Sequence, residues 1–144
     1  MSVRIKRITL WRRDVDNEPG ALGSTLEPLA ARGADLEIVM GYAYPGDSSR
    51  AAIEVYPVSG RKTKAAAERA GLHPSETPTL LVEGKNVPGL GFALARALGE
   101  SGINISFLVT QVIGKRYVSV FGFKTEGEAK RAATILENTS KRKR

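Results

Sequence analysis

Asn86-Val87-Pro88-Gly89 repeats Asn17-Glu18-Pro19-Gly20 in this chain of 144 residues, and the repeat decides the fold. The offset that aligns these two segments also aligns further turn and apolar residues, without a gap: Leu29 with Leu98, Gly33 with Gly102, Asp35 with Asn104, and Leu36 with Ile105. These matches mark the turns and apolar anchors of one structural unit. We therefore interpret the chain as two copies of a single module.

Each copy predicts a strand followed directly by a helix. The apolar runs 8–11 and 79–82 precede the two Pro-Gly dipeptides. Proline suits the first helical position, where its missing N–H is not needed, and glycine suits the left-handed end of a helix. Helical spacing then relates apolar residues in each copy: Leu22, Leu26, Leu29 and Ala30 in the first, and Leu90, Leu94, Ala97 and Leu98 in the second.

Two alternating stretches follow each predicted helix. Residues 36–44 and 51–58 flank a Pro-Gly-Asp turn in the first copy, and residues 105–109 and 117–123 flank Gly114-Lys115 in the second. Alternation of this kind predicts strands. A second helix is predicted at 61–71 and at 126–138, so that each copy reads β-α-β-β-α. The aromatic residues of these strands, among them Trp11, Tyr42, Tyr44 and Phe107, are expected in a core or an interface.

Two features leave the organisation open. Pro28 lies inside the first predicted helix and should kink or break it, because its ring displaces a helical hydrogen bond. Residues 79–82 could close the first module or open the second, and the register of the repeat favours the second. The second module then has no closing strand of its own. We expect modules at 1–75 and 76–140, with a basic tail at 141–144.

Composition excludes several kinds of function. The chain has no cysteine and one histidine, so neither a metal centre nor a histidine- or cysteine-based catalytic site is expected. We predict a non-enzyme without a cofactor. No apolar run is long enough to span a membrane, and we expect a cytoplasmic protein. The tail supplies four of the seven net positive charges, and such a short terminal run does not predict a nucleic-acid partner.

The order of elements, the Asx-x-x-Pro-Gly loops and the segments Gly102-Ile103-Asn104-Ile105 and Gly33-Ala34-Asp35-Leu36 resemble the ACT-domain family. This resemblance covers nearly the whole chain as a tandem pair. It implies an α+β fold of two ferredoxin-like modules, with antiparallel sheets and helices on one face. It further implies a regulatory protein that binds an amino acid. We also expect a homodimer, because an open sheet edge can pair with another chain. The sequence departs from the family pattern at Gly91 and Pro28.

The candidate ligand site lies where the first helix of each module begins. Free N–H groups at a helix start suit a carboxylate, and nearby side-chain oxygens suit an ammonium group. The candidate residues are Asp16, Asn17, Gly20, Ala21, Leu22 and Asp35 in the first module, and Asn86, Pro88, Gly89, Leu90, Gly91, Asn104 and Ile105 in the second. The same pattern is also an ordinary turn and helix start. Two alternatives therefore remain: an assembly scaffold with vestigial sites, and a nucleic-acid-binding ferredoxin-like protein.

Overall fold

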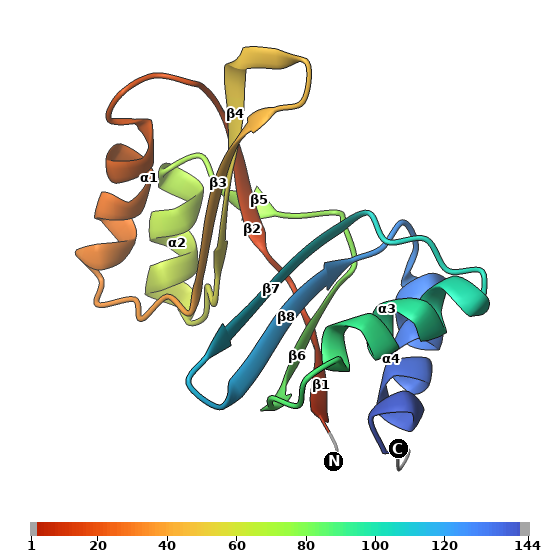
Figure 1. The fold of residues 1–144 in the computed structure, drawn as a ribbon. Coiled ribbons are helices and arrows are strands. Elements are labelled where there is room, and N and C mark those ends of the chain that lie inside the picture. The colour runs from red at the N-terminus through yellow and green to blue at the C-terminus, as the bar shows by residue number, and fades with distance from the viewer. Residues whose placement is uncertain (1–2, 142–144) are drawn as a thin grey trace. The chain divides into compact units, whose positions relative to one another are not determined.

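The computed structural model describes residues 3–141 of the chain. It contains four helices and eight strands among these residues (Figure 1). In chain order they are β1 (Val3–Ile8), β2 (Trp11–Asp16), α1 (Ala21–Ala30), β3 (Ile38–Tyr44), β4 (Asp47–Tyr56), α2 (Arg61–Arg69), β5 (His73–Pro74), β6 (Thr79–Lys85), α3 (Leu90–Glu100), β7 (Phe107–Ile113), β8 (Arg116–Gly122) and α4 (Glu126–Lys141).

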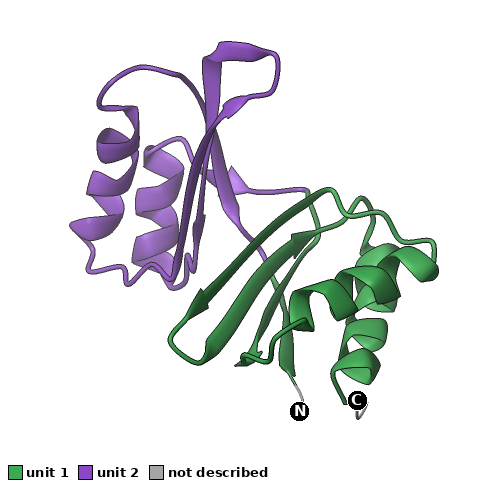
Figure 2. Cartoon of the chain, viewed as in Figure 1, with its two compact units in different colours: residues 1–8, 77–144 green, residues 9–76 purple. Residues whose placement is uncertain are grey.

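The elements form two compact units (Figure 2). Unit 1 comprises residues 1–8 and 77–144, and unit 2 comprises residues 9–76. Each unit is an antiparallel four-stranded sheet with two helices packed on one face, ordered β1-β6-β8-β7 in unit 1 and β3-β4-β2-β5 in unit 2. In both units the strand before the first helix lies inside the sheet. The predicted fold class, two ferredoxin-like modules of ACT type, is therefore confirmed.

The fourth strand differs between the units, and here the expected division of the chain needs correction. Residues 79–82 open the second copy, as the register favoured. The closing strand that the second copy lacked is β1, which pairs with β6 from Val3–Gly84 to Ile8–Thr79. The expected module 1–75 therefore loses its first eight residues to unit 1. The expected strand at 8–11 is also wrong, because the chain leaves β1 at Ile8 and enters β2 at Trp11.

Each unit has its own apolar core between its sheet and its helices. Leu29 of α1 and Leu98 of α3, which the repeat aligned, are both completely buried. Gly33 and Gly102 follow these helices with φ of 73° and 75°. The N–H groups of Ala34 and Ile103 then bond back to the carbonyls of Leu29 and Leu98 at 3.1 and 3.0 Å. The glycine ends predicted for both helices are thus confirmed.

Two helices differ from expectation. Pro28 does not break α1, which continues to Ala30, because a proline so near the helix end removes one bond without interrupting the final turn. Helix α4 extends beyond the predicted residue 138 to Lys141. Ser140 is buried, and its hydroxyl accepts a hydrogen bond from the Val3 N–H at 3.3 Å. The first residue of the expected tail is therefore helical, and residues 142–144 lie outside the described part.

Candidate functional site

The start of α1 is fixed by the backbone of Gly20. This residue precedes the helix with φ of 91°, in the left-handed region that side chains other than glycine disfavour. Gly89 precedes α3 with φ of 84°. A Cβ added to either glycine would meet no atom within 4 Å. The left-handed backbone therefore favours glycine at both positions, whereas a Cβ at either position would cause no steric clash.

The first N–H group of α1 and of α3 is bonded within the preceding loop, from Ala21 to the Glu18 carbonyl at 3.3 Å and from Leu90 to the Val87 carbonyl at 3.0 Å, so any free donors lie further into the first turn. Within residues 3–141, no side chain caps the N-terminus of either helix. Helix starts of this kind attract anionic groups, because their N–H groups and dipole point outward. The helix starts of both units therefore fit the prediction of a position that attracts a carboxylate.

Asn17 and Asn86 anchor the loops in front of these helices. The Asn17 N–H donates to the Ser49 carbonyl and its side-chain amide donates to the Ser48 carbonyl, both at 2.8 Å. The Asn86 N–H likewise donates to the carbonyl of Lys115 at 2.7 Å. Both residues thus have a structural role in holding the loop against the neighbouring hairpin.

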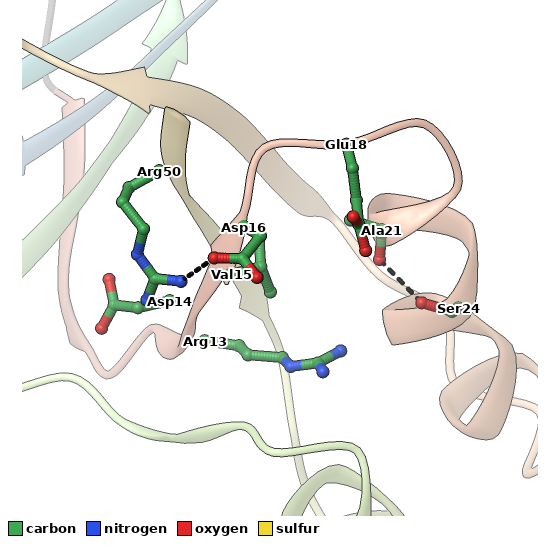
Figure 3. Close-up of a pocket in the computed structure, with 8 residues that line it drawn as sticks. All are labelled: Arg13, Asp14, Val15, Asp16, Glu18, Ala21, Ser24 and Arg50. Atoms are coloured by element: carbon green, nitrogen blue, oxygen red, sulfur yellow. Dashed lines mark hydrogen bonds and ion pairs between the residues drawn. The ribbon is translucent and has the colours of Figure 1, made fainter. Parts of the chain in front are cut away.

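A pocket of about 270 Å³ opens beside the start of α1 in unit 2 (Figure 3). Its lining comes from β2, the following loop, α1 and β4: Arg13, Asp14, Val15, Asp16, Glu18, Ala21, Ser24 and Arg50. Two of the predicted residues, Asp16 and Ala21, belong to this lining. Binding pockets for drug-sized ligands span roughly 300–1,000 Å³, so this one suits a smaller molecule.

One wall of the pocket is an open strand edge. β5 pairs with β2 only at Trp11 and Arg12, and within the described residues no strand continues beside the rest of β2. The Leu10 carbonyl accepts a bond from the Ser75 N–H at 2.7 Å, which shows that Leu10 faces the β5 side. Backbone direction alternates along a strand, so the N–H and carbonyl groups of Asp14 and Asp16 also face this open side.

The charged side chains of the pocket differ in how they are held. Arg50 forms an ion pair with Asp16 at 2.6 Å (Figure 3). Arg13 donates a hydrogen bond to the Thr25 hydroxyl of α1 at 2.7 Å. The Glu18 carboxylate has no hydrogen bond or ion pair with any residue between 3 and 141. Glu18 is therefore the acid in this pocket that is most available to a cationic group.

Asp14 connects the pocket to a polar cluster on the sheet face opposite the helices. A hydrogen bond from Tyr44 lowers the pKa of Asp14 and outweighs the effect of burial, and a hydrogen bond from Arg12 lowers it further. Burial by itself would lower the pKa of Arg12, but the hydrogen bond to Asp14 and the nearby Tyr42 raise it above the ordinary value. Both groups are thus charged across the neutral range.

Glu54 lies in the same cluster and is 3% exposed. It accepts a hydrogen bond from the Tyr42 hydroxyl at 2.9 Å, and Arg12 lies 3.8 Å from it. Burial, followed by this bond to Glu54, raises the pKa of Tyr42. Tyr42 and Tyr44 were expected in a core or an interface. They are not core residues, because their hydroxyls bind the carboxylates of Glu54 and Asp14 on the face that the helices leave uncovered, and their place in an interface stays a prediction.

The predicted residues of the second copy are less concentrated. Leu90 is buried in the core of unit 1, and Ile105 packs against the same core. A Cβ at Gly91 would make an ordinary contact with Tyr117 at 3.9 Å. Pro88 and Gly89 are exposed at the helix start. Of these residues, the helix start therefore offers a ligand mainly backbone groups.

Asp35 and Asn104 do not join the helix starts within their own units. Each follows the last turn of the first helix, and both are exposed. The whole length of α3 lies between Gly89 and Asn104. Leu22 is exposed on α1 and lies outside the pocket lining. Asp35 and Asn104 thus lie beyond the far end of the first helix in their own units, whereas Leu22 lies in the first turn of α1, and a ligand contact by any of the three stays a prediction.

Comparisons with known proteins identify the fold. No family model matches the chain, and no curated protein matches it. Protein BT0572 from Bacteroides thetaiotaomicron superimposes with a TM-score of 0.73 at 17% identity, over 93% of this chain and 89% of that one. The regulatory subunits of aspartate kinase from Thermus thermophilus and Thermus flavus both give 0.63, at 14% and 17% identity. Each comparison covers 96% of this chain and 97% of the other.

The fold and these likenesses define a class of fold: a pair of ACT-like, ferredoxin-like modules. Among residues 3–141 no group of histidine and acidic side chains could hold a metal ion. None of the helices in that range is long and apolar enough to cross a membrane.

Proposed function

We propose that this chain is a non-catalytic regulatory protein that binds an amino acid in the unit 2 pocket. The observation that carries the proposal is the meeting of an open strand edge, an uncapped helix start and charges of both signs around about 270 Å³. An amino acid carries one ammonium and one carboxylate group, and it needs acceptors and donors placed side by side. The likeness to regulatory subunits of aspartate kinase supports a sensing role.

The charges assign an orientation to the ligand. Its ammonium group would bind Glu18 and the open carbonyl of Asp14, because Asp16 is already paired with Arg50. Its carboxylate would bind at the start of α1, close to Arg13. Charge-assisted hydrogen bonds of this kind are roughly twice as strong as neutral ones.

Glu18→Gln tests the site with little risk to the fold. It removes one charge while keeping the shape, and Glu18 makes no side-chain contact that the fold needs. We expect an amino acid that stabilises the wild type in a thermal-shift screen of all twenty to bind the variant about 10- to 150-fold more weakly, from a loss of roughly 1.5–3 kcal/mol. Calorimetry would measure the affinity, and one ligand per chain is the expected ratio.

Glu27→Gln is the matched control, because Glu27 is exposed on α1 and does not line the pocket. It should bind like the wild type. Equal binding by the wild type and Glu18→Gln would place the ligand elsewhere. If none of the twenty stabilises the wild type at millimolar concentration, the sensor function fails, and an assembly scaffold becomes the better description.

The proposal includes a homodimer. β7 is an edge strand of its sheet, contains no charged residue and exposes Leu108, Val109, Val112 and Ile113 to 44–65%. Such an edge is a template for pairing with another chain, and proteins that stay monomeric commonly protect it with charge. We expect Val109→Lys to convert the dimer to a monomer in light scattering, whereas Leu22→Lys on α1 should leave it dimeric. A wild-type monomer at all accessible concentrations would contradict this part.

A further inference from the structure

Two equivalent positions in the two sheets carry opposite arrangements of charge. Asp16 at the end of β2 lies directly opposite Arg50 of β4, and these side chains form an ion pair at 2.6 Å. The sequence repeat places Lys85 at the corresponding end of β6, directly opposite Arg116 of β8. Unit 1 thus has two cations where unit 2 has a neutral pair.

Two cations directly opposite each other repel unless an anion binds between them. Side chains directly opposite each other on antiparallel strands have Cβ atoms about 4.5–5.5 Å apart, and like charges there are destabilising. Lys85 and Arg116 are both exposed, so the charges are screened but remain on the same face of the sheet. An anion bound between them would remove the repulsion.

The surroundings add positive charge. Arg4 of β1 and Lys115 of the hairpin turn are also exposed near this end of the sheet. Glu83 is the acid among them, and it is shared by Arg4 at 2.9 Å and Arg116 at 3.7 Å. Lys85 forms no ion pair with any residue from 3 to 141. Among the described residues, this one carboxylate therefore forms ion pairs with two of the four neighbouring cations.

A pocket lies at this end of the unit 1 sheet. A pocket of about 290 Å³ is lined by Val3, Arg4, Glu83, Gly84 and Arg116. Its two guanidinium groups come from strands on either side of β6, the strand that ends at Lys85. A ligand in this pocket could contact both guanidinium groups, and Lys85, which does not line the pocket, directly follows its lining residue Gly84 on β6.

We propose that this end of the unit 1 sheet is a binding site for a phosphate-bearing anion, held by Arg4, Lys85 and Arg116. A phosphoryl group has three acceptor oxygens and a charge of about −1.5 to −2 at neutral pH. It can therefore accept bonds from two guanidinium groups and an ammonium group at once, which a single carboxylate does less well. The site is separate from the amino-acid pocket of unit 2.

Lys85→Asp is the sharpest test, because it copies the unit 2 pairing into unit 1. The variant should fold, since Asp16 occupies the corresponding position in unit 2 opposite an arginine. With inorganic pyrophosphate in a phosphate-free buffer, we expect the melting temperature of the wild type to rise by about 2–4 °C. Lys85→Asp should show no rise, and calorimetry should show at least about tenfold weaker binding. Lys130→Asp, with the same charge change on α4, should respond like the wild type.

A single-stranded oligothymidylate separates the two sources of such an anion. If pyrophosphate binds in a Lys85-dependent way, the ligand is a small phosphate compound. If only the oligonucleotide binds, still in a Lys85-dependent way, the phosphate belongs to a nucleic-acid backbone. If neither probe binds the wild type, or if Lys85→Asp binds as well as Lys130→Asp, the proposal is overturned.

Discussion

Deleting residues 1–8 should unfold unit 1 and leave unit 2 folded. β1 lies at the N-terminus of the chain, next to β2 in sequence, yet it is the fourth strand of the unit whose other elements all follow residue 76. The expected division at residue 75 predicts the opposite result, because it assigns these residues to the first module. The deletion therefore distinguishes the two arrangements directly.

The size of the effect follows from what β1 buries. Val3 is 9% exposed and Ile8 is 3% exposed. Burying one such side chain contributes roughly 1.5–3 kcal/mol, so the two together contribute about 3–6 kcal/mol. The deletion also removes the backbone pairing between β1 and β6 and the bond between Val3 and Ser140. Domains are stable by only about 5–15 kcal/mol, so this loss removes most of the stability of unit 1.

Amide hydrogen exchange followed by NMR resolves the outcome for each unit. We expect the amides of Val82 and Phe121 in the deletion variant to exchange freely, and those of Ile53 and Val55 to stay protected. Leu29→Ala provides the mirror image, since truncating a buried leucine costs about 2–5 kcal/mol and should lower protection in unit 2. Wild-type protection at Val82 and Phe121 without β1 would refute the assignment of the strand.

Five single-residue variants, arranged in three tests, examine other parts of the structure. Gly20→Ala should lower the free energy of unfolding by about 1–2 kcal/mol, the cost of a left-handed backbone at a residue with a side chain. Gly23→Ala inside α1 should raise it by about 0.5–1 kcal/mol, so denaturant unfolding of the two variants should show opposite signs. Tyr44→Phe should raise the pKa of Asp14 toward the ordinary value of about 3.9 in an NMR titration. The depressed pKa of Asp14 contributes stability that is present above about pH 4 and is lost as pH falls through the folded pKa. Tyr44→Phe should therefore lose part of this stability at neutral pH. An unchanged titration of Asp14 would contradict the role of Tyr44. Ser140→Ala leaves the Val3 N–H unpaired and should cost about 1–3 kcal/mol in thermal unfolding, whereas Asn138→Ala on the exposed face should change stability by less than about 0.5 kcal/mol.

The local elements could be predicted from the sequence because short-range features determine them. Gly33 and Gly102 end the two helices with positive φ, as expected. The placement of proline at the first helical position was wrong, because α1 and α3 begin at Ala21 and Leu90, two residues after Pro19 and Pro88, and a left-handed glycine lies between. The repeat then adds a constraint that one copy alone would lack. The class of fold followed from the order of these elements.

The fourth strand could not be predicted in this way. Ile8 and Thr79 pair in the structure although they lie far apart in the chain, and nothing in the alternation of either strand identifies its partner. The one available signal was negative: the second copy had no closing strand before its end. An unfilled edge in one module and an unassigned segment at the other end of the chain together indicate the pairing.

The pocket was only partly predictable for the same reason. Asp16 and Ala21 were identified because they are neighbours of Pro19-Gly20 in sequence. Arg50 reaches the pocket from β4, a strand whose register with β2 places it opposite Asp16. Arg13 was missed because it follows the strand alternation toward the helices. Finding Arg50 would have required the true extents of β2 and β4, which differ from the predicted strands 8–11 and 51–58, together with their register.

The two copies of the module differ most where their ligands would bind. In unit 2 the fourth strand is two residues long, so the backbone of β2 stays open beside Asp14, where we propose that the amino acid binds. In unit 1 the corresponding residue, Glu83, is paired with Arg4 of the six-residue β1, and its strand edge is closed. Closing that edge brings Arg4 to the sheet beside the opposed Lys85 and Arg116. A single difference, the length of the fourth strand, therefore accounts both for the loss of the strand-edge site in unit 1 and for one of the cations that we assign to its anion site.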